Sequence, residues 1–239
     1  AEALDRLMAA GAIAVALDLI LADPSLYGEF DDQRLQESLQ RYADQTVLAI
    51  TYELFGTEDA IQTQLVYPYG PFQVEGLRLG LISYLPDPDG RIYRLASDFD
   101  DLILRPGGFV SAEIPSLAEA TLHAAHHLPS SSTAGNIYFY GPARTFTHIP
   151  FWHILDPQNW AYHQQAGTFE DAIVLIGPTA LSFQDFARTP FGEMTGIELH
   201  ANSIATLQQE RVVRDLISGS LGQVLIVLLG TVLWGVGLM

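Results

Sequence analysis

Polar side chains gather in the loop after an expected buried strand at 172–177 and at the start of an expected helix at 197–211. They are Asp185, Thr189, Glu198, His200 and Asn202. A carboxylate beside an imidazole can orient it for acid–base catalysis. The same groups can contact a ligand, or hold a long loop through buried hydrogen bonds. We favour the structural role first, ligand contact second and catalysis third.

The elements that must position these groups are buried strands. The run AIAVALDLIL (12–21) is almost continuously apolar, as in strands covered on both faces of a parallel sheet. Asp18 interrupts it near its carboxyl end, and the loop 178–196 follows the later strand in the same way. Ligands of open α/β sheets bind in the crevice at this edge. We therefore predict a ligand-binding set with no catalytic residue: Asp18, Asp185, Thr189, Glu198, His200 and Asn202.

The first fifty residues alternate between helical and strand patterns, and 12–52 forms a strand–helix–strand unit. We expect helices at 1–10, 31–43, 116–128, 151–155 and 197–211, strands at 12–21, 46–52, 136–140 and 172–177, and an antiparallel hairpin of 80–84 with 91–96 around PDPDG. The predicted fold class is α/β. It is a single domain with a largely parallel or mixed sheet flanked by helices, followed by the start of a transmembrane helix.

The C-terminal run carries no charged residue after Asp215. Its last 19 residues, Leu221–Met239, would span about 28 Å as a helix, close to a hydrocarbon core of roughly 30 Å. A buried core helix is the alternative, but the apolar character covers every face. We predict a soluble domain over 1–215 and the start of a membrane segment over 216–239.

Signals for metals, cofactors and catalysis are weak. His123 and His127 are spaced i, i+4, as two ligands of one metal can be, but a solvated helix face explains them better. The aspartates at 87, 89, 98, 100 and 101 do not follow the EF-hand pattern, and a solvated hairpin is the better interpretation. The chain has no cysteine and no phosphate-loop or nucleophile-elbow motif. We expect no metal, no cofactor and no enzymatic activity in this segment.

The charge balance restricts the partners. The chain has 28 acidic and 11 basic residues, for a net charge of −17. A nucleic-acid-binding protein needs a basic surface to neutralise phosphates, so we expect no nucleic-acid partner. The same charge opposes docking to anionic lipids through a basic patch.

Several segments resemble the type-2 CHASE domain, the cyclases/histidine kinases associated sensory extracellular domain. They are VALDLILADPS, DPDGRIYR, NIYFYGPARTFTHIPFWHIL and AIVLIGPTALSFQDFARTPFGEMTGIELHANSIATLQQ, in the family's order. The last is the most specific. The matching polar positions are Asp18, Asp89, Arg91, Asp185, Thr189, Glu198, His200 and Asn202. The resemblance supplies no ligand and no catalytic residue.

The resemblance implies an α/β sensor outside a bacterial cell membrane, held by membrane helices and coupled to an intracellular cyclase or kinase. We expect residues 1–215 on the periplasmic side, a membrane contact through the C-terminal helix and a homodimer. The stimulus is an unknown small molecule or a physical signal. A dimerisation or partner-binding module without a small ligand is the second hypothesis. A hydrolase that uses Asp185 and His200 is the third.

Overall fold

The computed structural model describes residues 1–57, 60–104, 114–127, 135–214, 227–228 and 231. Its helices are α1 (Glu2–Ala9), α2 (Glu29–Arg41), α3 (Ser97–Phe99), α4 (Leu117–Ala124), α5 (Trp152–Leu155), α6 (Pro157–Gln165) and α7 (Gly196–Gln208). Its strands are β1 (Ala14–Leu17), β2 (Thr46–Thr57), β3 (Ala60–Val66), β4 (Arg78–Leu81), β5 (Ile173–Ile176), β6 (Phe186–Thr189) and β7 (Gly192–Thr195). The predicted α/β class with a mixed sheet is confirmed.

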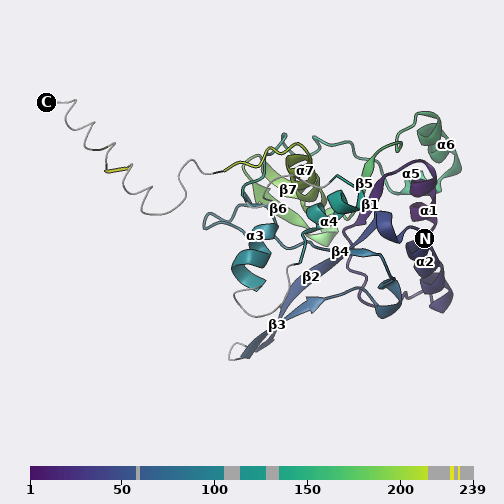
Figure 1. The fold of residues 1–239 in the computed structure, drawn as a ribbon, viewed down its shortest axis with the longest axis horizontal. Coiled ribbons are helices and arrows are strands. Elements are labelled where there is room, and N and C mark those ends of the chain that lie inside the picture. The colour runs from purple at the N-terminus through teal and green to yellow at the C-terminus, as the bar shows by residue number, and fades with distance from the viewer. Residues whose placement is uncertain (58–59, 105–113, 128–134, 215–226, 229–230, 232–239) are drawn as a thin grey trace.

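The centre of the fold is a parallel sheet in the order β4-β2-β1-β5. Val15 on β1 is opposite Thr46 on β2 and Val174 on β5. The second half of β2 leaves this sheet and pairs antiparallel with β3. The β2–β3 hairpin therefore projects from the body of the domain (Figure 1).

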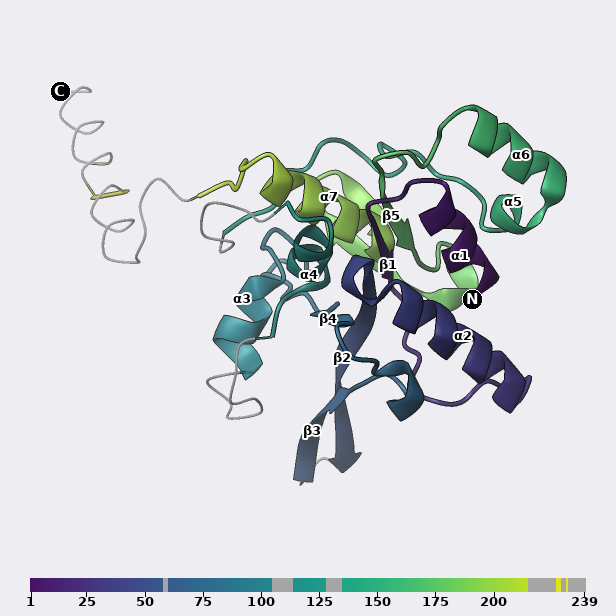
Figure 2. The same cartoon turned by 45° about the vertical axis from the view of Figure 1, so that its right-hand side comes forward.

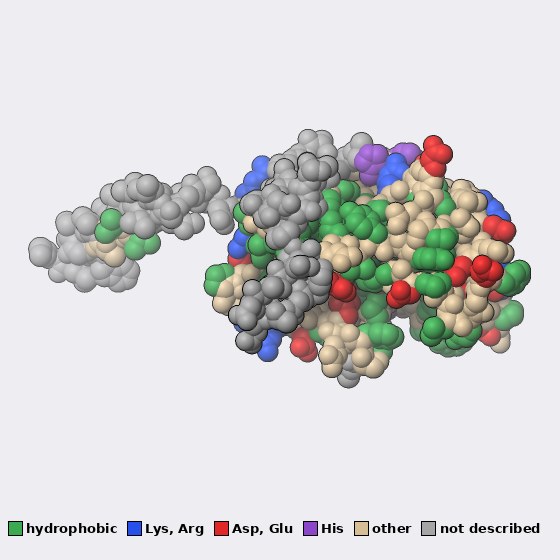
Figure 3. Space-filling model, turned by 90° about the horizontal axis from the view of Figure 1, so that it is seen from below, with side chains coloured by type: hydrophobic (Ala, Val, Ile, Leu, Met, Phe, Trp, Pro, Cys, Tyr) green, Lys and Arg blue, Asp and Glu red, His purple; other side chains and the backbone are tan. Residues whose placement is uncertain are grey.

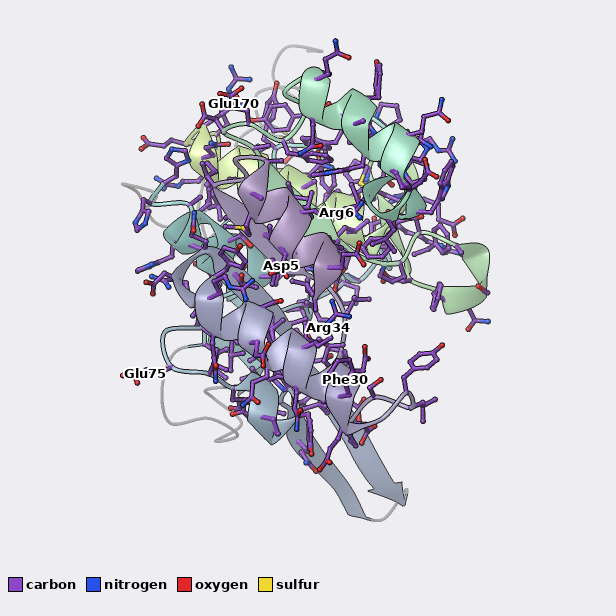
Figure 4. All side chains as sticks on the ribbon, turned by 90° about the vertical axis from the view of Figure 1, so that its right-hand side faces the viewer. Asp5, Arg6, Phe30, Arg34, Glu75 and Glu170 are labelled. Carbon is purple, nitrogen blue, oxygen red and sulfur yellow. The ribbon has the colours of Figure 1, made fainter. Side chains whose placement is uncertain are left out.

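Alternate residues of β1 face two helical layers. Val15 and Leu17 lie in one apolar cluster with residues of α1 and α2, which run side by side over that face (Figure 4). Ala14 and Ala16 pack on the other face against α4. Helix α7 lies beside α4 on this second face, and Figure 2 shows the two together. Both faces of the sheet are buried, which explains the near-continuous apolar run of the first strand.

The predicted hairpin of 80–84 with 91–96 is wrong. Its first two residues, 80 and 81, lie at the end of β4, which pairs parallel with β2 at the edge of the sheet. The second segment bonds elsewhere: Ile92 N–H donates to the Arg188 carbonyl, and Leu95 N–H donates to the Gly135 carbonyl. The turn itself forms, with a 2.8 Å bond from Asp87 N–H to the Arg91 carbonyl.

The predicted strand at 136–140 is also wrong. Only Asn136 makes β-bridges, to Arg94 on one side and Val213 on the other. Ile137 N–H still donates to the Tyr93 carbonyl, but the N–H groups of Tyr138 and Tyr140 donate to side chains of α7 in place of a neighbouring strand. The apolar alternation of this segment arises because it lies along a helix.

Several elements were not predicted from the sequence, among them β3, the β6–β7 hairpin and α6. The segment 178–196, expected to be a loop, contains the β6–β7 hairpin, in which Ala187 is opposite Met194. Helix α6 follows α5 directly and is capped by Asp156, whose carboxylate accepts the Asn159 N–H at 2.9 Å. The predicted membrane segment 216–239 lies outside the described residues except for Val227, Leu228 and Thr231.

Gly80 on β4 lets α4 approach the sheet. A Cβ at this position would lie 2.5 Å from Leu117 Cα and 3.0 Å from Leu117 N, both backbone atoms of α4. Gly80→Ala is therefore expected to lower the free energy of unfolding by about 1–3 kcal/mol, because α4 must move away from the sheet. Urea unfolding of the chain measures this change.

Gly70→Ala is the matched control, because no heavy atom lies within 4 Å of a Cβ at Gly70. Its stability should stay within about 0.5 kcal/mol of wild type. Equal effects of the two substitutions would contradict the close packing of α4 on β4.

Candidate functional site

Helix α7 begins at Gly196 because side chains and neighbouring groups satisfy its first turn. The Glu198 carboxylate accepts the Thr195 N–H at 3.2 Å and the Thr195 hydroxyl at 2.9 Å. Gly196 N–H donates to the Asp185 carbonyl at 3.2 Å. A Cβ at Gly196 would lie 2.5 Å from Asp185 Oδ1, so only glycine leaves room for this carboxylate.

Glu198 also holds the loop that passes over the start of α7. Its Oε1 accepts the Arg144 N–H and lies 3.2 Å from His148 Nε2. Burial raises the pKa of Glu198, but the donors from Arg144 and Thr195 and the nearby His148 together lower it below its usual value. Both oxygens of this buried carboxylate are thus engaged by donors of the protein.

Asn202 and Thr206 are spaced one helical turn apart on α7 and bind the segment after Asn136. Asn202 Oδ1 accepts the Tyr140 N–H at 3.0 Å, and its amide donates to the Glu198 carbonyl at 2.9 Å. Thr206 Oγ1 accepts the Tyr138 N–H at 3.1 Å. Both side chains are fully buried and hold backbone that has no strand partner here.

Thr189 closes the β6–β7 turn. Its buried hydroxyl donates to the Gly192 carbonyl at 2.8 Å and accepts the Phe191 N–H at 3.2 Å. These bonds give Thr189 a structural role in the hairpin.

A buried polar cluster joins the carboxyl end of β1 to α7. Asp18 is 7 % exposed and His200 is 2 % exposed, and 3.9 Å separates Asp18 Oδ2 from His200 Nε2. On the other side of the ring, the Tyr84 hydroxyl lies 3.0 Å from His200 Nδ1 and 2.9 Å from Ser203 Oγ. Ser203 Oγ in turn donates to the Leu199 carbonyl at 3.0 Å.

The donor and acceptor roles in these hydrogen bonds show which of Ser203, Tyr84 and His200 carries each proton. The Ser203 hydroxyl donates to Leu199, so the Tyr84 hydroxyl must donate to Ser203. The Tyr84 oxygen then accepts from His200 Nδ1, which leaves Nε2 without a proton and facing Asp18. Burial lowers the pKa of His200 to about 3, which keeps the ring neutral. A neutral Asp18 is compatible with this arrangement, because an ionised carboxylate would face a lone pair.

Asp18 has no hydrogen bond from its carboxyl group within the described residues. Burial, and then the charge of Asp185, raise its pKa from 3.8 to about 7. Burial also raises the pKa of Asp185, while the Gly196 N–H opposes the shift. The structure therefore brings together three of the six predicted residues, Asp18, Asp185 and His200. It places Thr189, Glu198 and Asn202 in hydrogen bonds that hold the surrounding loops.

A cavity of about 240 Å³ opens beside the start of α7. It is lined by Ala143, Arg144, His148, Thr179, Phe186, Glu193, Met194, Thr195 and Glu198. Arg144 adopts a left-handed backbone conformation with φ of 68°, which is uncommon for a residue other than glycine. Arg144 and His148, and also Tyr84 and Ser203, were not predicted from the sequence. Only Ser203 had a local signal, because it lies three residues after His200 on the same helix.

The surface histidines and aspartates considered as metal ligands have protein partners. His123 Nδ1 accepts from Arg78 Nε at 3.0 Å, and His127 Nδ1 lies 3.4 Å from Gln208 Nε2. Asp87 forms an ion pair with Arg94. The described part of the chain contains no group of three or more His, Asp or Glu side chains arranged around a common metal position.

The hydrolase hypothesis required Asp185 and His200 to form an acid–base pair. The two nitrogens of His200 face Tyr84 and Asp18 instead, and its ring is almost fully buried. Among the described residues, no hydrogen bond or ion pair joins His200 to Asp185. The geometry therefore gives this hypothesis no support.

Asp18→Asn is expected to raise the stability of the domain, relative to wild type, more at about pH 8 than at about pH 5. Folding raises the pKa of Asp18 from 3.8 to about 7, so the folded protein binds this proton more tightly than the unfolded chain does. Wild type therefore loses stability as the pH rises through this interval, and asparagine removes the loss. Urea unfolding across this range measures the difference.

Asp23→Asn, an exposed position on the same loop, should show no such trend. A difference between wild type and Asp18→Asn that stays constant with pH would contradict the buried, neutral Asp18.

Comparison with known proteins identifies the family. The family model for the CHASE2 domain matches residues 1–238. Neither the curated proteins nor the solved structures that were searched gave a match. Within the described residues, no helix is both long and apolar enough to cross a membrane. With a match over nearly its whole length, the chain belongs to the CHASE2 family, a family of extracellular sensory domains in signalling proteins.

Proposed function

We propose that this chain is the extracytoplasmic sensory domain of a bacterial membrane receptor, and that α7 passes its conformational change to an intracellular cyclase or kinase. The observation that carries the proposal is the buried contact between Asp18 at the carboxyl end of β1 and His200 on α7. This edge of a parallel sheet is where ligands of open α/β folds bind. A stimulus that acts on Asp18 or Asp185 would therefore act directly on the helix.

Helix α7 is suited to carry such a change. Its N-terminus is held by Asp185 and Glu198, and its buried side binds the segment 138–140. After α7, Val213 exchanges two backbone hydrogen bonds with Asn136, at 2.8 and 2.9 Å. A shift of α7 would thus move the exit of the chain, after which the proposed membrane segment 216–239 follows.

A stimulus changes the output only through its different affinity for two conformations of the domain. The cluster at Asp18 would make two conformations differ in energy, because a charge on Asp18 would face the Nε2 lone pair of His200 and the Asp185 carboxylate. Relief of that repulsion requires either a proton, a cationic group or a displacement of α7. The proposal therefore links occupancy of the crevice to the position of α7.

The test is the signalling output of the full-length receptor in membranes. Asp18→Asn and His200→Gln are each expected to change the basal or stimulated output at least about threefold, a change of about 0.65 kcal/mol in a two-state equilibrium. Asp23→Asn should leave the output unchanged. If both variants accumulate as folded protein and give wild-type output, α7 does not carry the signal through this contact.

A partner-binding role is the second candidate, and exposed aromatic side chains on α5–α6 favour it. Phe151, Trp152 and Tyr162 are 51 %, 57 % and 68 % exposed. Acidic side chains are scattered over the face drawn in Figure 3, where apolar side chains also reach the surface.

We expect Trp152→Ser with Tyr162→Ser to weaken dimerisation of the receptor in sedimentation velocity measurements. A monomeric wild type, or an unchanged dimer in this variant, would exclude a role of this surface in dimerisation.

A further inference from the structure

Two histidines outside the crevice face each other between α5 and α6. His153 Nδ1 lies 3.2 Å from His163 Nε2, and His163 is only 8 % exposed. We propose that His153 and His163 form a two-imidazole site for a divalent transition-metal ion such as Zn²⁺ or Cu²⁺. Water completes the coordination, since no third His, Asp or Glu joins the pair in the part of the chain that the structure describes.

The separation of the two nitrogens suits a shared metal ion. Imidazole nitrogens bind Zn²⁺ at about 2.0–2.1 Å, so two of them on one ion lie about 2.8–3.4 Å apart for angles between octahedral and tetrahedral. The observed 3.2 Å lies within this interval. Small rotations of the rings would bring both lone pairs onto an ion beside the line that joins the nitrogens.

The second nitrogen of His163 is already oriented as in metal sites. His163 Nδ1 lies 3.3 Å from Thr168 Oγ1, and a bond from the distal ring N–H to an oxygen fixes the tautomer that leaves Nε2 free. The ring also packs against Phe169, with ring centroids 5.6 Å apart. His163 is therefore held rigidly, while His153 on the short helix α5 is less buried and completes the pair.

The protons balance without an external acid or base. In the metal-free pair, His153 Nδ1–H donates to the Nε2 lone pair of His163. On metal binding, the His153 proton moves through water to its own Nε2, and Nδ1 becomes a ligand. Two neutral imidazoles favour Cu²⁺ and Zn²⁺ over Mg²⁺ and Ca²⁺, which prefer oxygen ligands.

A bound ion would link α5 and α6 to α1. Arg6 on α1 donates to the Ile154 carbonyl at 2.7 Å, directly after His153. Ile154, Trp160 and Phe169 share an apolar cluster with Leu4 and Leu7 of α1. Figure 4 shows the side chain of Arg6 on α1, next to the two short helices. The metal would therefore stiffen the layer that contains the first helix of the chain.

The test is titration of the full chain with Zn²⁺, followed by calorimetry, with Mg²⁺ as the hard-cation control. We expect one Zn²⁺ per chain, no response to Mg²⁺, and a loss of affinity of at least about tenfold in His153→Gln. His153 is the residue to substitute because His163 is buried in the core. The variant His123→Gln with His127→Gln removes two surface histidines and should bind as wild type does.

Electron paramagnetic resonance of Cu²⁺ gives a second readout, which should show nitrogen couplings that His153→Gln reduces. Binding that persists in His153→Gln, or that disappears with His123 and His127, would overturn the assignment. So would wild type that takes up no ion at about 1 mM free Zn²⁺, because the pair would then be a hydrogen bond alone.

Discussion

Helix α7 buries polar side chains against the rest of the domain, and most of the structure around the crevice depends on their hydrogen bonds. Glu198, Asn202 and Thr206 accept from or donate to backbone groups that no neighbouring strand satisfies at these positions. A buried polar group without a partner costs about 1–3 kcal/mol, so each of these contacts fixes the helix and its partner segment together. The domain therefore uses a helix where a longer sheet would otherwise supply the bonds.

Asp18 is the exception within this network. It ends β1, its N–H continues the ladder to the Ile176 carbonyl at 2.8 Å, and its carboxyl group faces His200. Burial is the largest cause of the opposite pKa shifts of the two residues: it favours their neutral forms, and so raises the pKa of Asp18 and lowers that of His200. Charge placed at this point has no compensating cation among the described residues. This makes the junction between sheet and helix sensitive to a proton or a cationic group.

Much of the fold could be predicted from local patterns. The apolar runs around Val15 and Val174 indicated strands buried on both faces, and the parallel sheet confirms this. The segment 136–140 is also rich in apolar and aromatic residues, but its neighbours include side chains of α7, and no local pattern reveals this. For the site, polar residues that follow parallel strands were expected to share one crevice. This expectation correctly grouped Asp18, Asp185 and His200. It could not find Tyr84, whose contact with His200 spans 116 positions in the chain.

The most direct measurement is nuclear magnetic resonance of the domain during a pH titration, with labels on the Asp18 carboxyl carbon, the His200 ring nitrogens and the backbone amides. The account predicts that Asp18 titrates near pH 7, that His200 stays neutral with its proton on Nδ1, and that amides of α7 and Val213 shift with the same midpoint. An Asp18 midpoint near its ordinary value of 3.8 would contradict the account. So would shifts confined to the immediate neighbours of Asp18, because the helix would then not respond to the crevice.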